Sequence, residues 1–147
     1  MIVLDTTVLV YAKGDTHPLR DPCRELISAI ANRDLEATTT VEAIQEFVQV
    51  RARRRGRSDA VKLASDYVEL LSPLLTVSGE HLRQGLSIFE SSERLGAFDA
   101  VLAAVALSIG ARALISADTA FASVPGLHHV VPDAAGVADI LEQESAG

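Results

Sequence analysis

The first ten residues of the chain, MIVLDTTVLV (1–10), start as a buried β-strand and then change character. The apolar run at 2–4 is followed directly by a carboxylate, Asp5. The stretch LISADTAF (114–121) repeats this arrangement near the other end of the chain, where an apolar run leads to Asp118. Turn chemistry, in which an Asp side chain accepts backbone hydrogen bonds, explains each acid alone. A site that needs several acids close together explains both at once.

The rest of the chain alternates short apolar or β-branched runs with stretches of helical spacing. Besides the first strand, we predict strands at 35–40, 74–77, 113–117 and 128–131. We predict helices at 20–33, 58–71, 78–92, 99–111 and 134–141, and one that begins near Val41 and stops at Gly56. Ser58 is the expected N-cap of the helix that follows. Strands separated by helices favour parallel pairing. We therefore expect a single layered α/β domain over residues 1–147, with a central, mainly parallel sheet of four or five short strands.

The composition excludes several classes of protein. No apolar run approaches the ~20 residues of a membrane-spanning helix, so we expect no membrane partner and a cytoplasmic location. The single cysteine, Cys23, excludes an internal disulfide and is typical of a reducing compartment. A net charge of −7 argues against indiscriminate coating of nucleic acid. It leaves room for a local basic surface, because RARRRGR (51–57) holds five of the 13 basic residues.

Other well-known catalytic patterns are missing from the sequence. It contains no GxxxxGK[ST] phosphate loop, no GxGxxG turn and no GxSxG nucleophile motif. The four histidines lack cysteine partners and zinc-ligand spacing, so a zinc site is not expected. The acidic residues are left as the candidates for chemistry.

Four acids stand at positions where a fold of this class would gather them. Asp5 and Asp118 follow strands, and ligand sites of open α/β sheets collect at the carboxyl ends of strands. Asp99 starts an apolar helix, and Glu46 lies at the margin of the buried half of another. Taken singly, each Asp is explained by capping and Glu46 by a boundary position. Taken together, they would repel one another unless a cation lay among them, and Mg²⁺ or Mn²⁺ suits oxygen ligands.

Glu42 and Glu46 are one helical turn apart and must be distinguished. The sequence Thr39-Thr40-Val41-Glu42 matches a capping box, in which the Glu side chain returns to the backbone of the cap residue. This explains Glu42 structurally. Glu46 has no such explanation and is the stronger candidate for a cleft.

Four sequence blocks, in the same order, resemble the signature blocks of PIN-domain ribonucleases, and more narrowly VapC-type toxins of VapBC toxin–antitoxin systems. They are MIVLDTTVLVYA (1–12), TTTVEAIQEF (38–47), LGAFDAVLAAVALSIGA (95–111) and ALISADTAF (113–121). The resemblance implies a three-layer α/β/α fold and an acidic quartet that holds one or two Mg²⁺ or Mn²⁺ ions, namely Asp5, Glu46, Asp99 and Asp118. It also implies supporting roles for Thr7 and Ser116. Many relatives carry Arg or Lys at the position of Ala117.

The resemblance implies a metal-dependent endoribonuclease that hydrolyses phosphodiester bonds, with structured RNA such as tRNA as the substrate. It further implies inhibition by a VapB-type antitoxin and a homodimer. One alternative is a catalytically silent PIN module that binds RNA or protein. Another is a receiver-like or phosphatase-like domain with Asp5 as phosphate acceptor, which Thr7 disfavours because it occupies the place of the second acid in a D-x-D motif.

The arginine-rich stretch 51–57 is the candidate contact with RNA phosphates. Arg53 lies two helical turns after Glu46 on nearly the same face, so it is expected beside the metal site. The candidate RNA-binding residues are Arg51, Arg53, Arg54 and Arg55. The alternative is a solvated helix end that complements the helix dipole.

Overall fold

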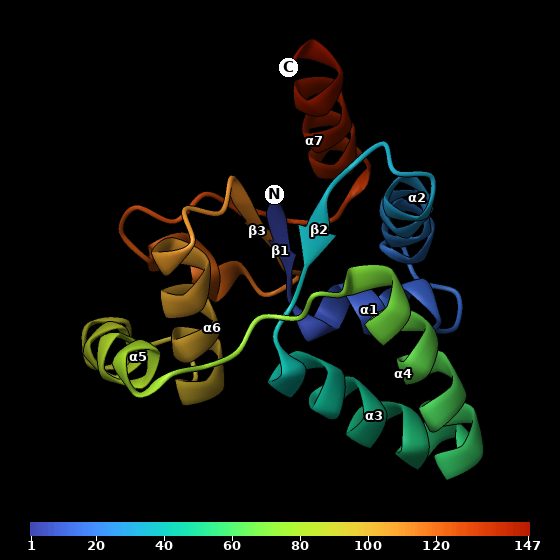
Figure 1. Cartoon of the computed structure of the whole chain (residues 1–147). Coiled ribbons are helices and arrows are strands. Elements are labelled where there is room, and N and C mark those ends of the chain that lie inside the picture. The colour runs from blue at the N-terminus through green and yellow to red at the C-terminus, as the bar shows by residue number, and fades with distance from the viewer.

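The computed structural model describes residues 1–147, and its centre is a four-stranded, wholly parallel sheet. The order of the strands across the sheet is β2-β1-β3-β4, so β1 and β3 lie side by side although they come from opposite ends of the chain (Figure 1). The predicted sheet is confirmed. The strands are β1 (Ile2–Leu4), β2 (Ala37–Thr38), β3 (Ala113–Ile115) and β4 (His129–Val130).

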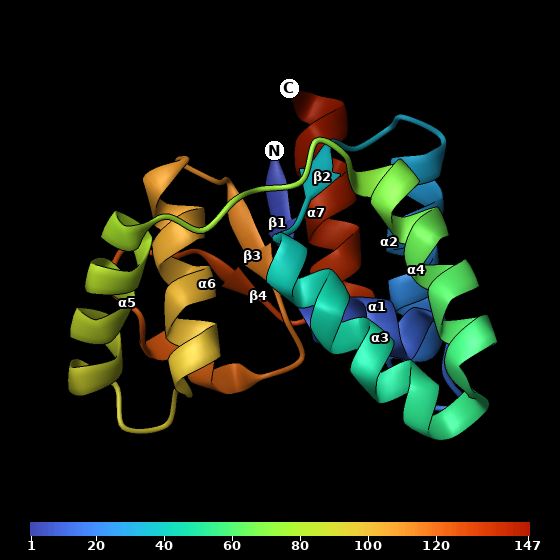
Figure 2. The same ribbon diagram turned by 60° about the horizontal axis from the view of Figure 1, so that its bottom comes forward.

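Seven α-helices and one 3₁₀ helix cover the sheet. Helices α5 and α6 lie on one side of it, and the other α-helices lie on the opposite side, which is the three-layer α/β/α arrangement (Figure 2). No helix combines the length and the apolar character needed to cross a membrane. The helices are α1 (Thr6–Ala12), α2 (Arg20–Ala31), α3 (Val41–Arg55), α4 (Arg57–Leu71), α5 (Gly79–Ser91), α6 (Ala97–Ser108), α7 (Ala134–Ala146) and the 3₁₀ helix η1 (Thr119–Ser123).

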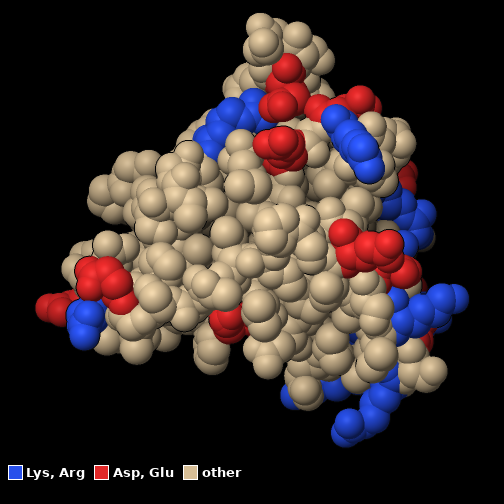
Figure 3. All heavy atoms as spheres, viewed as in Figure 1, with Lys and Arg blue, Asp and Glu red and all other residues tan.

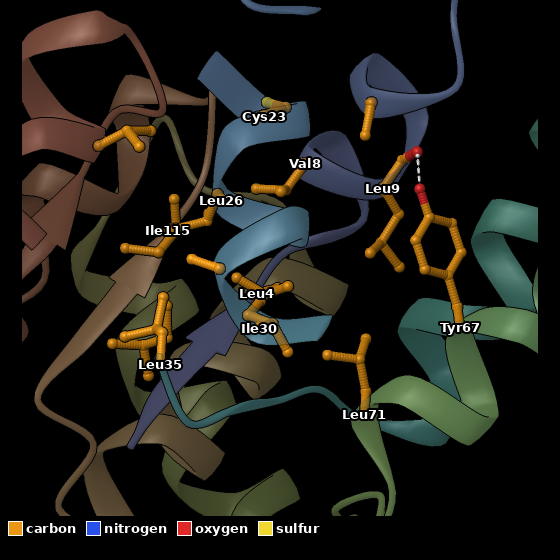
Figure 4. Packing of buried hydrophobic residues seen from close by; sticks show 14 of the residues in the cluster. Leu4, Val8, Leu9, Cys23, Leu26, Ile30, Leu35, Tyr67, Leu71 and Ile115 are labelled. Carbon is orange, nitrogen blue, oxygen red and sulfur yellow. Dashed lines mark hydrogen bonds between the residues drawn. The ribbon is translucent and has the colours of Figure 1, made fainter. Parts of the chain in front are cut away.

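Alternation of side chains along the strands divides the apolar core in two. Ile2, Leu4 and Ile115 face one way and join the larger cluster with α1, α2, α3, α4 and α7 (Figure 4). Val3 and Leu114 face the other way and pack against α6 and η1. Because helices cover both faces, every strand residue of β1 and β3 is buried, which explains why these strands appear in the sequence as unbroken apolar runs.

The structure differs in kind from the prediction at two places. Helix α1 was not predicted, because its sequence TTVLVYA is rich in β-branched residues that favour strands. Burial of Val8 and Leu9 in the larger cluster overrides that preference. The strand predicted at 74–77 is wrong, since Leu75 makes only an isolated parallel bridge to Thr40.

Other differences concern where elements begin and end. Helix α4 starts at Arg57, so Ser58 is not its N-cap. Gly56 separates α3 from α4 with a φ of 89°, a backbone conformation that favours glycine. Strand β2 covers only the middle of the predicted 35–40, and α7 continues to Ala146.

The parallel sheet decides where the acids lie. The register pairs Leu4 with Ile115, so the residues that follow, Asp5 and Ser116, leave the sheet at the same level. Strand β2 leads at this edge into α3, which carries Glu46. Helix α6 returns the chain to the start of β3, so its N-terminal end lies at the carboxyl edge as well.

Candidate active site

Asp5 is a buried carboxylate at the carboxyl end of β1, with only 4% of its surface exposed. It occupies the N-cap position of α1, but its side chain caps no backbone N–H there. Its Oδ2 instead accepts hydrogen bonds from the hydroxyls of Ser116 (2.6 Å) and Thr7 (3.0 Å). Helix capping therefore does not account for this acid.

The same two hydroxyls connect Asp5 to the loop that follows β3. The N–H of Asp118 donates to Ser116 Oγ at 3.0 Å, and the N–H of Ala117 donates to Thr7 Oγ1 at 3.0 Å. Each hydroxyl thus accepts a hydrogen bond from the loop backbone and donates one to the carboxylate of Asp5. The accepted bond leaves the hydroxyl proton pointing toward Asp5. Asp5 and Asp118 belong to one hydrogen-bonded network, although they lie near opposite ends of the sequence.

Asp118 also has a local structural role. It is the N-cap of η1, and its Oδ1 accepts a hydrogen bond from the N–H of Ala120 at 2.9 Å. The capping explanation offered for this residue is therefore met in the structure. Its other carboxylate oxygen takes no part in the cap, and its side chain is half-buried beside the network around Asp5.

A cleft of about 620 Å³ opens at the carboxyl edge of the sheet, between α3 and α6. Its acidic lining residues are Asp5, Glu42, Glu46 and Asp99, and we call it the acidic cleft. Acidic atoms reach the surface between α6 and the start of α3 (Figure 3). Three of the four predicted site acids thus share one cavity, with Asp118 joined to them through Ser116.

Asp99 shows how closely the four acids are associated electrostatically. The N-cap of α6 is Gly96, so Asp99 lies inside the first turn and is not the cap. Burial raises the pKa of Asp99 to about 7, together with the negative charges of Asp5, Glu46 and Asp118. A carboxyl pKa raised in this way by burial and by like charges in a cleft is a physical mark of a functional site.

Glu46 stands at the rim of the acidic cleft on the exposed side of α3. Partial burial, with the negative charge of Asp5, raises the pKa of Glu46. The same residue also lines a second groove, on the other side of the α3 ridge. Glu46 therefore lies where two cavities meet.

The capping box predicted for residues 39–42 is wrong. Thr40 caps α3, with its Oγ1 accepting from the N–H of Ala43 at 3.1 Å, and the hydroxyl of Thr39 donates to the carbonyl of Leu4 at 2.6 Å. The cap is shifted by one residue because Thr39 is needed to join β2 to β1. Glu42 is left free of the cap and lines the acidic cleft.

The four acids offer only oxygen ligands, which suits Mg²⁺ or Mn²⁺ and disfavours softer metals. No three acidic, histidine or cysteine side chains are arranged to hold a metal ion directly. Mg²⁺ commonly binds through one or two carboxylates and keeps several waters, so a spacing too wide for direct ligation by all four is compatible with this ion. The chemistry of the donor set therefore fits a hard divalent cation.

Comparisons with known proteins show the family of the chain. The family model for the PIN domain matches residues 2–127. The chain belongs to the PIN-domain family. Ribonuclease VapC7 of Mycobacterium tuberculosis is 58% identical over 142 residues, which cover 96% of this chain and 98% of that protein. Ribonuclease VapC23 of the same organism is 30% identical over 99 residues, or 67% of this chain and 78% of that protein. Within the family, this PIN domain is therefore of the VapC type.

Solved structures show the same fold at low sequence identity. Mycobacterium tuberculosis VapC20, described as a sarcin-ricin loop cleaving toxin, has a TM-score of 0.68 at 17% identity and covers 84% of this chain and 96% of its own. VapBC2 of Rickettsia felis, solved with a DNA fragment from its promoter, has a TM-score of 0.69 at 16% identity, covering 89% and 98%. These likenesses establish the PIN fold of the chain.

The arginine-rich end of α3 in this PIN domain divides into paired and unpaired side chains. Arg51 forms an ion pair with Asp59 of α4 and donates to the carbonyl of Lys13 at 2.8 Å. Arg55 pairs with Asp15 at 3.0 Å. Arg53 and Arg54 have no ion pair or side-chain hydrogen bond. Lys and Arg atoms gather over this end of the molecule, at the lower right of Figure 3.

The side chains of Arg53 and Arg54 lie in different hollows. Arg53 is expected from the sequence beside Glu46, but it lines a hollow between α3 and α4. Arg54 shares the second groove with Glu46. The stripe Glu46, Val50, Arg54 follows the i, i+4 spacing of the helix, so the neighbouring turns place Arg54 on the groove side.

Several residues that line the acidic cleft were not predicted. Phe98 lies directly before Asp99 and is 81% exposed, an unusual state for a large apolar side chain. In the sequence, a phenylalanine at the start of an apolar helix suggests a core residue. It is exposed in the structure because the N-terminal end of α6 lies at the carboxyl edge of the sheet. Gln45 and Gln49 line the cleft from the polar side of α3, where their spacing with Glu42 and Glu46 was a usable signal.

Proposed function

We propose that this chain is a metal-dependent endoribonuclease toxin of the VapC type that hydrolyses phosphodiester bonds of RNA, with structured RNA such as tRNA as the substrate class. The observation that carries the proposal is the acidic cleft, in which burial and like charge raise the pKa of Asp99 to about 7. The 58% identity to a protein named as a ribonuclease supports the same reaction. The proposed site is Asp5, Glu46, Asp99 and Asp118, holding one or two Mg²⁺ or Mn²⁺ ions.

The acids have different tasks in this proposal. Asp5 is the fixed ligand, because two hydroxyl donors hold its Oδ2 and leave Oδ1 without a hydrogen-bond partner. Asp99 and Glu46 approach from helices on the two sides of the cleft and complete the ion site, directly or through water. Asp118 has one oxygen in the η1 cap, so it acts through its other oxygen, in a second ion site or on the attacking water.

A bound divalent ion supplies Lewis acidity, which makes water nucleophilic at neutral pH and neutralises the charge of the phosphoryl transition state. The protein holds the carboxylates in place before substrate arrives. Thr7 and Ser116 serve as positioning residues, because each orients Asp5 and the loop of Asp118 at once. No histidine lines the acidic cleft, so the carboxylates are the groups available to accept a proton from water.

The proposal is tested by cleavage of total cellular RNA in Mg²⁺ and in EDTA. We expect the wild type to cleave RNA only with the metal, and Asp5→Asn and Asp99→Asn to be inactive. Asp139→Asn, an exposed acid of α7, removes the same charge far from the cleft and serves as the matched control. Identical RNA profiles for the wild type and both cleft variants would show a catalytically silent module.

We also propose that a VapB-type antitoxin covers the acidic cleft. The cleft combines uncompensated carboxylates with the exposed ring of Phe98, so a basic side chain next to an apolar one complements it. Co-expression with a cognate VapB-type antitoxin should abolish cleavage, and Phe98→Ser should weaken the complex while leaving the fold intact. A complex of unchanged affinity would place the antitoxin elsewhere.

A homodimer is proposed through the outer face of α5. Leu82, Leu86 and Phe89 follow i, i+4, i+7 spacing and are 48%, 53% and 46% exposed, so they form one apolar stripe. A second copy of the chain presents the same stripe and covers it by two-fold symmetry. Light scattering should report a dimer for the wild type and a monomer for Leu86→Glu; a monomeric wild type would contradict the proposal.

A further inference from the structure

The second groove, which meets the acidic cleft at Glu46, has a volume of about 430 Å³. It runs between α3 and the segment that leaves α1, and we call it the side groove. The residues that characterise it are Thr7, Tyr11, His17, Val50 and Arg54. Thr6 and Glu46 line both cavities, so the acidic cleft and the side groove are continuous. A linear polymer bound in the acidic cleft can therefore extend along the surface into the side groove.

Two aromatic rings line the side groove. The rings of Tyr11 and His17 lie 4.4 Å apart between centroids and are tilted by 31°. Tyr11 is half-buried against the larger core, whereas His17 is exposed, so the tyrosine supports the histidine from within. The Nδ1 of His17 accepts a hydrogen bond from the N–H of Leu19 at 3.0 Å, which fixes the ring and makes Nε2 the protonated nitrogen of its neutral form.

Two arginines hold the loop that carries His17 against α3. Arg51 donates to the carbonyl of Lys13, and Arg55 pairs with Asp15 in the same loop. These side chains are therefore committed to positioning. Arg54 makes neither kind of contact and remains an unpaired cation that lines the groove. The arrangement places one free guanidinium and one aromatic platform along a path that begins at the acids.

We propose that the side groove binds the nucleotide next to the scissile phosphodiester, with its base stacked on the Tyr11–His17 pair and its phosphate paired with Arg54. This inference rests on the proposed ribonuclease function. Aromatic stacking and phosphate pairing are the two means by which proteins bind single-stranded nucleic acid without reading its sequence. The groove therefore selects for an unpaired nucleotide beside the cleavage site, since a base within a duplex cannot stack on a protein ring.

Two arginines that are adjacent in sequence and both exposed should differ in their effect on RNA binding. Arg54→Gln should weaken RNA binding, whereas Arg53→Gln, which removes the same charge from a different hollow, should have at most a small effect. His17→Asn removes the ring but keeps an acceptor for the N–H of Leu19, so the loop is retained. Tyr11→Phe keeps the ring and serves as the matched aromatic control.

The experiment measures binding of a fluorescein-labelled single-stranded RNA decamer of mixed sequence by anisotropy, in EDTA at low ionic strength. We expect His17→Asn to weaken binding roughly tenfold, the size that stacking on one ring contributes. Arg54→Gln should weaken binding by roughly the same factor, because one phosphate contact is lost at low ionic strength. Arg53→Gln and Tyr11→Phe should stay within about twofold of the wild type. A second decamer with abasic sites should lose the His17→Asn effect and keep the Arg54→Gln effect.

Three results would overturn the inference. Equal losses of RNA affinity for Arg53→Gln and Arg54→Gln would indicate a diffuse basic surface. Unchanged RNA binding by His17→Asn would show that no base stacks on the His17 ring. An equal loss for His17→Asn on the abasic decamer would show that the ring supports the fold only. The binding assay does not depend on catalysis, so an inactive wild type that still shows the expected binding pattern would refute the proposed function and leave the side groove standing.

Discussion

Replacing Asp99 by asparagine removes a carboxyl group whose pKa is raised to about 7 by burial and by the charges of Asp5, Glu46 and Asp118. The folded protein therefore binds a proton at this site more tightly than the unfolded chain, in which the pKa returns to its ordinary value of 3.8. The stability that this group contributes is fully present below about pH 4 and is lost as the pH rises through 7. Asp99→Asn has no carboxyl group to ionise at this position, so it does not lose this stability as the pH rises.

The size of the effect follows from the two pKa values. They differ by about 3, which corresponds to about 4 kcal/mol at 1.36 kcal/mol per pKa unit. The side chain is only half-buried, and water screens part of the repulsion, so we expect about 1 to 2 kcal/mol. In EDTA, Asp99→Asn should be more stable than the wild type by that amount at pH 8 and by less at pH 5.

Urea unfolding followed by circular dichroism measures this difference, with Asp139→Asn as the control for loss of one negative charge. Addition of Mg²⁺ at pH 8 should reverse the order, because an ion that binds only the folded state stabilises the wild type and not the variant. An advantage of Asp99→Asn that is the same at pH 5 and pH 8, or one that Asp139→Asn shares, would refute a raised pKa of Asp99 as its cause.

Three further substitutions test the structure around the site. Ser116→Ala removes the 2.6 Å hydrogen bond to Asp5 and should weaken Mn²⁺ binding, measured by calorimetry, by about 10- to 100-fold. An unchanged Mn²⁺ affinity would contradict the positioning role of Ser116. Gly85→Ala places a Cβ 2.8 Å from the Cα of Val101, which should lower the free energy of unfolding by about 1 to 3 kcal/mol. The higher helix propensity of alanine offsets ~1 kcal/mol of that loss, and a raised Tm would contradict the expectation. Tyr67→Phe leaves the carbonyl of Leu9 without its 2.8 Å donor and should lower the free energy of unfolding in urea by about 1 kcal/mol, whereas no change would show that water replaces the hydroxyl.

The sequence was sufficient for the sheet and for the edge at which the acids gather. Apolar runs that end in Asp5 and Asp118 predict parallel strands with acids at their carboxyl ends, and the register of Leu4 with Ile115 brings the two exits together. The apolar runs and the acids that follow them are local features of the sequence, and parallel strands share one carboxyl edge, so no strand order was needed to place the acids at that edge.

What the sequence could not provide depends on long-range contacts. Helix α1 forms because its apolar side chains are buried between the sheet and α3, although its own residues favour a β-strand. The shift of the α3 cap from Thr39 to Thr40 follows from the bond between the Thr39 hydroxyl and Leu4. Helical spacing puts Arg53 and Arg54 on different sides of α3, but the groove that Arg54 lines is formed by the loop that carries His17, and no local pattern specifies where that loop packs.

The central claim is that water, activated within the acidic cleft, attacks the RNA phosphodiester. Its most direct measurement is mass spectrometry of the first products formed from a single RNA oligonucleotide in ¹⁸O-labelled water with Mg²⁺. We predict one ¹⁸O atom in the terminal phosphate for each bond cut, and no 2′,3′-cyclic phosphate. Unlabelled cyclic phosphate as the first product would show attack by the neighbouring 2′-hydroxyl, and would contradict the activation of water by Asp5, Glu46, Asp99 and Asp118.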